Sequence, residues 1–139
     1  MLIRPALAAE LGDVLAFWQT AAENENRPAD RHAALAALHL RDPDALLVAV
    51  DVDEIVGTVI AGWDGWRCHL YRLAVAPHRR REGIGRRLIA VAEERFRVLG
   101  GTRADAMVLD SNTDAHGAWS AGGYRRQADW SRWVKPLAG

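Results

Sequence analysis

The clearest pattern of apolar and polar positions in this chain runs from residue 70 to residue 99. Residues 70–75 are rich in apolar side chains and predict a β-strand, which Pro77 ends because proline has no N–H to donate to a sheet. Apolar side chains then recur every three or four residues from Ile84 to Leu99, as on one face of an amphipathic helix. Gly100 and Gly101 predict the end of that helix.

The remaining pattern predicts elements on both sides of this segment. We expect strands at residues 2–5, 45–50, 55–63, 103–109, 124–128 and 131–135, and helices at residues 8–22, 31–40 and 113–121. Asp30 is expected to cap the second of these helices, Gly57 to mark a bulge, and Asp64-Gly65 to form a two-residue hairpin turn. The order of elements predicts an α/β protein with a mixed sheet and helices on its faces.

Composition narrows the class of protein. The 139 residues are half hydrophobic, which suits one domain with a single core. We see neither an apolar run long enough to span a membrane nor an export signal, and the lone cysteine, Cys68, excludes an internal disulfide and a cysteine-rich zinc site. A cytoplasmic protein is therefore expected. The net charge is zero, yet residues 1–66 carry a charge of −7 and residues 67–139 a charge of +7, which favours an anionic ligand on one side.

An anion site is predicted where the strand at residues 70–75 leads into the long helix. Arg79, Arg80 and Arg81 precede Gly83 and Gly85 at the start of that helix. Glycine lets the backbone approach a ligand closely, and the first turn of a helix presents N–H groups without helical acceptors. A dinucleotide-binding fingerprint is not favoured, because Leu88 stands where a small residue is needed, and no P-loop lysine follows the glycines. The pattern predicts a cradle for a phosphate or diphosphate.

Two motifs resemble those of the GNAT superfamily of N-acetyltransferases. Residues 80–85, Arg-Arg-Glu-Gly-Ile-Gly, are similar to its acetyl-CoA signature Q/R-x-x-G-x-G/A. Asn112, Ala115, Trp119, Gly123 and Tyr124 follow the spacing of its N-x-x-A-x-x-x-Y-x-x-x-G-F pattern. The resemblance covers nearly the whole chain. It implies one GNAT domain over residues 1–139, with a mixed, mostly antiparallel central sheet flanked by helices, and acetyl-CoA as the acetyl-donor cosubstrate.

The resemblance also implies which residues bind acetyl-CoA. Main-chain amides of the arginine–glycine loop would hold the diphosphate, with the strand before the loop pairing with the pantetheine arm and a backbone N–H near Leu73 polarising the thioester carbonyl. The neighbouring strands, at residues 70–75 and 103–109, would splay apart to admit the thioester. The implied binding residues are Leu73, Ala74, Val75, Arg80, Arg81, Glu82, Gly83, Ile84, Gly85, Arg86 and Asn112.

Three residues are candidates for catalysis. His69 occupies the position where the family often has a glutamate base; it is either the general base or a hydrogen-bonded structural histidine. Tyr71 shares its strand face by period-two alternation, whereas Cys68 faces the other way and is expected in the core. Trp119 stands where the family often has a tyrosine acid, and indole does not give up its proton. Three outcomes are therefore open: the thiolate leaves unaided; Ser120, Tyr124 or water protonates it; or the domain binds acetyl-CoA without efficient transfer.

The reading that combines these features is an N-acetyltransferase, in which a primary amine of a small molecule or peptide attacks acetyl-CoA directly in a ternary complex. We expect no metal, no nucleic acid and no membrane, and leave a homodimer open. Glu23, Glu25 and Asp64 would form an acidic rim for a cationic acceptor, and Trp63 and Trp66 are expected to be cross-strand partners. The alternative is a non-catalytic acyl-CoA-binding module of the same fold. A nucleic-acid-binding domain is disfavoured because the arginines lack interleaved exposed aromatic residues.

Overall fold

A computed structural model describes residues 1–22 and 29–138. The strands are β1 (Leu2–Pro5), β2 (Leu46–Asp51), β3 (Glu54–Trp63), β4 (Cys68–Val75) and β5 (Ala104–Ala106). The helices are α1 (Leu11–Ala21), α2 (His32–Arg41), α3 (Ile84–Leu99) and α4 (Thr113–Ala121), with single 3₁₀ turns η1 (Ala8–Glu10) and η2 (Pro77–Arg79).

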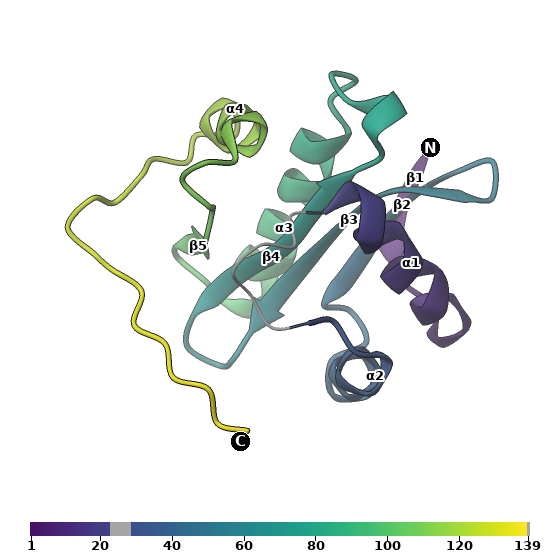
Figure 1. Ribbon diagram of the computed structural model, residues 1–139, viewed down its shortest axis with the longest axis horizontal. Coiled ribbons are helices and arrows are strands. Elements are labelled where there is room, and N and C mark those ends of the chain that lie inside the picture. The colour runs from purple at the N-terminus through teal and green to yellow at the C-terminus, as the bar shows by residue number, and fades with distance from the viewer. Residues whose placement is uncertain (23–28, 139) are drawn as a thin grey trace.

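The five strands form one sheet in the order β1-β2-β3-β4-β5. The pairs from β1 to β4 are antiparallel, and β5 pairs with β4 in parallel. Helices α1 and α2 cover one face of this sheet, and α3 covers the other (Figure 1). One core therefore lies between the sheet and α1 and α2, and a second between the sheet and α3. The predicted mixed, mostly antiparallel sheet flanked by helices is confirmed.

Helix α3 lies very close to β3. Its buried stripe includes Leu88 and Ile89, and a Cβ added at Gly57 of β3 would be 2.9 Å from Leu88 Cδ1 and 3.0 Å from Ile84 Cγ2. Only glycine leaves room for α3 at this point. The predicted irregularity is present beside it, because the β2–β3 register passes from Gly57 to Ile55 and leaves Val56 extra. The start of α3, which matters for the candidate site, is thus set by contact with the sheet.

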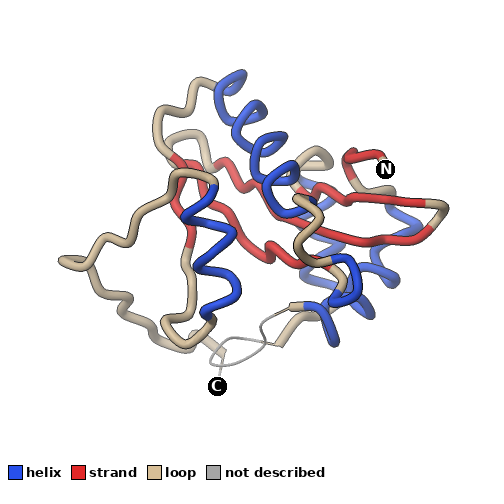
Figure 2. Tube along the Cα trace, turned by 90° about the horizontal axis from the view of Figure 1, so that it is seen from above, coloured by secondary structure: helices blue, strands red, loops and turns tan. Residues whose placement is uncertain are grey.

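The C-terminal part departs most from the prediction. Residues 122–138 contain no strand, so the strands expected at residues 124–128 and 131–135 are wrong. After α4 the chain continues as a long loop (Figure 2), and Trp130 and Trp133 on it are exposed. Strand β5 is also shorter than the predicted 103–109. A strand needs a partner to hydrogen-bond with, and apolar alternation alone does not supply one.

Three local predictions fail because a side chain bonds elsewhere. Asp30 does not cap α2, whose N-cap is Arg31, but pairs with the guanidinium of Arg72. Asp64 accepts hydrogen bonds from the N–H groups of Trp66 and Arg67, so the hairpin loop has four residues instead of two. Trp66 consequently lies in the loop under the Arg67 guanidinium, and Trp63 pairs across the sheet with Cys68.

None of the helices in residues 1–22 and 29–138 combines the length and the apolar composition that a membrane span requires. The cytoplasmic location stays a prediction.

Candidate functional site

The central feature of the candidate site is an open edge on β4. Pairing with β5 begins at Cys68 opposite Ala104 and ends at Leu70 opposite Ala106. Beyond Leu70, the part of the chain that the structure describes supplies no strand on this side of β4, while β3 continues to pair on the other side as far as Val75. The parting of β4 from its neighbour, expected from the sequence, is therefore present, and it exposes main-chain groups that an extended ligand can meet.

A β-bulge lies within this open stretch. Ile60 pairs with Tyr71 and Thr58 with Ala74, so Arg72 and Leu73 together oppose the single residue Val59. Arg72 has a φ of 52°, in the left-handed region that side-chain-bearing residues seldom adopt. The bulge also shifts the faces of β4: its alternation would turn Leu73 toward α1, yet Leu73 packs against the core on the α3 side. The bulge therefore reorients one peptide group at the point where β4 loses its second neighbour.

The open edge leads into the loop and the N-terminus of α3. Gly83 is the N-cap residue, with φ 82° and ψ 9°, a conformation that favours glycine. The first hydrogen bond of this turn runs from Arg87 N–H to the Gly83 carbonyl (3.1 Å), so the N–H groups of Ile84, Gly85 and Arg86 precede it and have no acceptor within the helix. These three N–H groups and the positive end of the helix dipole make an anion site.

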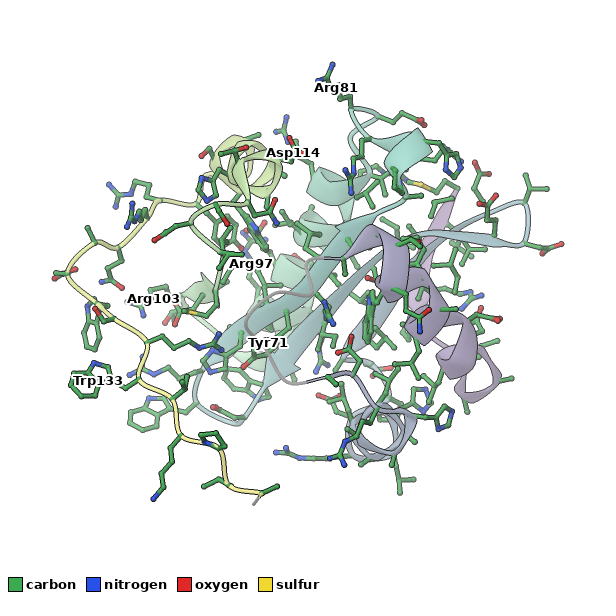
Figure 3. The ribbon with its side chains drawn as sticks, in the orientation of Figure 1. Tyr71, Arg81, Arg97, Arg103, Asp114 and Trp133 are labelled. Atoms are coloured by element: carbon green, nitrogen blue, oxygen red, sulfur yellow. The ribbon has the colours of Figure 1, made fainter. Side chains whose placement is uncertain are left out.

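The arginines around this turn have different roles. Arg79 is tied down by ion pairs with Asp51 (2.9 Å) and Glu82 (3.0 Å), which anchor the loop to the β2–β3 turn. Among the described residues, Arg80, Arg81 and Arg86 make no ion pair, and all three are exposed. Arg81 lies at the tip of the loop and points away from the protein (Figure 3). The main-chain N–H groups and these three cations together fit a diphosphate, whereas the side chain of Glu82 is turned toward Arg79.

A cavity of about 280 Å³ lies where β4 and β5 part, and it contains both candidate catalytic residues of β4. His69 and Tyr71 line it from the same side, with ring centroids 6.0 Å apart, which confirms their predicted common face. Asp64 lies 3.6 Å from His69 Nε2. Hydrogen bonds from the Arg67 and Trp66 N–H groups lower the pKa of Asp64, so this carboxylate is charged next to the imidazole across the neutral pH range. The Asp64 carboxylate is close enough to orient the His69 ring.

Cys68 lies in the core on the α3 side, with 2% of its surface exposed. Burial raises the pKa of its thiol, and the nearby charges of Asp105 and Asp64 act in the same direction. A neutral, enclosed thiol is a poor nucleophile. The expectation that Cys68 lies in the core is confirmed.

The second sequence motif builds α4 and its surroundings. Asn112 is the N-cap of α4, and its side-chain oxygen accepts the N–H of Ala115 (3.3 Å). Trp119 is buried in the core beside α3 and packs edge-on against Tyr124, with ring centroids 5.1 Å apart. Trp119 does not line the cavity that His69 and Tyr71 share. The roles of Asn112 and Trp119 toward a ligand stay predictions; their observed contacts are structural.

Tyr124 was one of three candidates to replace the missing acid. Its hydroxyl donates a hydrogen bond to Glu93 Oε2 (2.9 Å), and burial together with this bond raises its pKa well above the usual value for tyrosine. It lines a second cavity, of about 580 Å³, between the C-terminal half of α3, β5 and residues 122–127. That larger cavity contains no residue predicted for acetyl-CoA binding, and Tyr124 is the one candidate for catalysis in its lining, so size does not identify the site here.

Sequence reasoning missed three polar residues around the bulge. Trp18, Thr58 and Arg72 are buried and linked to one another across α1, β3 and β4. A signal was present for two of them, because Thr58 and Arg72 are lone polar residues within apolar strand segments, where a polar group must find a partner. Glu23 and Glu25 of the expected acidic rim lie outside the described residues.

The sequence and the fold are similar to those of known proteins. A family model described as the acetyltransferase (GNAT) family matches residues 12–124. An acetyltransferase from Photorhabdus laumondii is 32% identical over 112 residues, which cover 81% of this chain and 78% of that protein. The crystal structure of ribosomal-protein-alanine N-acetyltransferase from Brucella melitensis has a TM-score of 0.72 and 25% identity, covering 88% of this chain and 83% of that one. AAC(6')-Iy, in complex with a CoA-containing bisubstrate analogue, shares the fold with a TM-score of 0.77, at 20% identity and 98% coverage of both chains. The matched region contains the open edge of β4, the α3 cradle and the α4 motif, and the chain belongs to the GNAT family of acetyltransferases.

Proposed function

We propose that this protein transfers an acetyl group from acetyl-CoA to a primary amine, by direct attack of the amine in a ternary complex. The observation that carries the proposal is the continuity of the site. The unpaired edge of β4 ends at Val75, and Val75 Cγ2 lies only 3.7 Å from where a Cβ of Gly85 would be, beside the free N–H groups at the start of α3. An extended pantetheine arm ending in a diphosphate has the shape and charge for such a path.

In this proposal the chain binds its donor mainly through the backbone. The N–H groups of Ile84, Gly85 and Arg86 bind the diphosphate, helped by the exposed Arg80 and Arg81. Leu73, Ala74 and Val75 pair with the pantetheine arm, and Asn112 contacts it from α4. Acetyl-CoA supplies an activated acyl group, and the Leu73 N–H stabilises the negative charge that develops on the thioester oxygen. The structure of AAC(6')-Iy with CoA-S-monomethyl-acetylneamine supports CoA as the coenzyme.

His69 is the proposed general base. It lies in the cavity at the strand opening, beside the charged Asp64, and can take a proton from the incoming ammonium directly or through water. Tyr71 shares the cavity and can hold the amine in place. Asp64, 3.6 Å from His69, favours a cationic acceptor. Of the charged residues that line the cavity itself, Asp105 is already paired with Arg103, and Arg132 is a cation. A small molecule or a peptide amine fits this description.

The departing thiolate receives no obvious acid from the chain. The Trp119 indole lies in the core, and the Tyr124 hydroxyl is already committed to Glu93. We therefore propose that the thiolate, whose thiol has a pKa of about 8.5, leaves without a protein acid or takes its proton from water. The same observation favours the second candidate function, a non-catalytic acyl-CoA-binding module.

One experiment separates these two functions. The protein is incubated with acetyl-CoA and a panel of small amines and peptides, and free CoA is measured as thiol. Amine-dependent thiol release that falls strongly in His69→Gln supports the enzyme. Tight binding of acetyl-CoA with no release for any amine supports the binding module. Equal release by the wild type and by His69→Gln would leave transfer in place and remove His69 as the base.

A further inference from the structure

A chain of buried hydrogen bonds runs from α1 to the bulge of β4. The indole Nε1–H of Trp18 donates to Thr58 Oγ1 (2.8 Å), and the Thr58 hydroxyl donates to the main-chain oxygen of Arg72 (2.9 Å). Trp18 is 2% exposed and Thr58 fully buried, so water does not compete for these bonds. The direction of the chain is fixed by chemistry: an indole N–H can only donate, so the single hydroxyl hydrogen of Thr58 is used on the carbonyl.

The carbonyl at the end of this chain belongs to the strained residue of the bulge. Arg72 holds a φ of 52°, a left-handed conformation that is unfavourable for a residue with a side chain. Its guanidinium is fixed as well, through an ion pair with Asp30 and through its position 5.2 Å from the Trp18 ring centre. Both ends of Arg72 are therefore held by the α1 side of the protein, and Trp18 contributes to both.

The opposite side of the same peptide group faces the candidate site. In a trans peptide the C=O and the following N–H point in opposite directions. A carbonyl of Arg72 held toward Thr58 of β3 consequently directs the Leu73 N–H away from β3. That direction is the open edge of β4, where pairing with β5 has ended at Leu70. The buried chain and the open edge thus share one rigid peptide plane.

We propose that Thr58 and Trp18 are positioning residues for acyl transfer: by holding the Arg72 carbonyl, they fix the Leu73 N–H in the direction of the thioester oxygen. Neither side chain touches a substrate. The inference rests on the proposed function, in which this N–H stabilises the developing negative charge. A donor held in place before the reaction stabilises that charge without reorganisation, which is what makes such donors effective.

The test uses acetyl-CoA labelled with ¹³C at the thioester carbonyl, and infrared difference spectroscopy of the bound molecule. A hydrogen bond from the Leu73 N–H lowers the carbonyl stretching frequency relative to free acetyl-CoA. We expect this shift in the wild type, its retention in Thr58→Ser, and its loss in Thr58→Val, which keeps the shape of threonine and removes the hydroxyl. Trp18→Phe should show a partial loss. With any accepted amine, kcat should fall about 10- to 100-fold in Thr58→Val, with the CoA dissociation constant changed less than about twofold.

Phe96→Leu serves as the control for simple loss of stability, because Phe96 is buried at the far end of α3. It should lower the melting temperature and leave the carbonyl shift intact. If the wild type shows the shift and both Thr58→Val and Trp18→Phe show the same shift, the inference is overturned and the proposed function stands. If the wild type binds acetyl-CoA with no shift, or does not bind it, the proposed function fails too. Should Thr58→Val not fold, Trp18→Phe alone decides.

Discussion

The anion cradle can be tested by placing a charge at Gly83 while keeping the shape constant. Gly83 is the N-cap of α3, has a φ of 82°, and has no atom within 4 Å of the position where a Cβ would lie. Asparagine and aspartate both tolerate this left-handed conformation better than other side-chain-bearing residues, and both are good N-caps. The variants Gly83→Asn and Gly83→Asp are therefore expected to fold, and they differ only in one negative charge.

The size of the effect follows from Coulomb's law. A carboxylate at residue 83 would lie about 5 Å from a diphosphate bound at the N–H groups of Ile84, Gly85 and Arg86. With an effective dielectric constant of about 40, each negative charge of the diphosphate costs about 1.5 kcal/mol, and two charges about 3 kcal/mol. Since about 1.4 kcal/mol corresponds to a tenfold change in affinity, Gly83→Asp should bind CoA on the order of 100-fold more weakly than Gly83→Asn.

The measurement is isothermal titration of CoA into both variants and the wild type, at low and at high salt. Salt should reduce the difference between aspartate and asparagine, because the repelling groups are exposed to solvent. Equal CoA affinity of the two variants would refute the assignment of the diphosphate to this turn. A large loss in both variants at once would instead show that the glycine is needed for its conformation and leave the charge argument without support.

Three further outcomes are expected. Gly57→Ala should lower the free energy of unfolding by about 1–3 kcal/mol and weaken CoA binding, because the added Cβ displaces Ile84 and Leu88 at the start of α3. The matched control is Gly117→Ala, whose added Cβ meets no atom within 4 Å. Urea unfolding measures the stability of both variants, and titration with CoA measures their binding. Hydrogen bonds from Arg4 lower the pKa of Glu10, so its stabilisation is present above the unfolded-state pKa of about 4.3 and disappears as the pH falls through the folded-state pKa. Glu10→Gln should then cost about 1 kcal/mol at pH 7 and nothing in strong acid; a constant difference across the pH range would contradict this. The buried Cys68 thiol should react with iodoacetamide only when the protein opens, so CoA, if it stabilises the folded state, should slow the labelling. A labelling rate that CoA does not change, in a protein that CoA does stabilise, would contradict the burial of Cys68.

The elements that the sequence predicted well are those whose signals are local. Helix α3 was expected from Ile84 to Leu99 and has those ends, because an unbroken apolar stripe lies between glycines that define both termini. The glycine turn that leads into the first turn of α3 was predictable for the same reason, since the two are adjacent in the chain. Binding of a diphosphate there stays a prediction. His69 and Tyr71 were placed together by strand alternation alone.

The features that the sequence did not predict depend on partners far along the chain. The bulge at Arg72 exists because Thr58 takes its carbonyl and Asp30 its guanidinium, residues 14 and 42 positions away. Aspartate is a residue type that often caps helices, but only the fold shows that Asp30 pairs with the buried guanidinium of Arg72 and not with the N–H groups at the start of α2. The C-terminal strands failed likewise, since residues 124–135 have the pattern of strands and find no neighbouring strand in this fold.

The diphosphate cradle that we propose at the start of α3 is built from peptide groups, and this affects which mutations the protein should tolerate. Every amino acid except proline carries an N–H, so residues 85 and 86 can be exchanged widely without deleting a donor, whereas Ile84 is held by its burial in the core. What the sequence must preserve is the shape of the turn, and this requirement falls mainly on Gly83, which has the left-handed conformation. Random mutagenesis of this turn with selection for coenzyme binding should return a varied set of side chains around a nearly fixed residue 83.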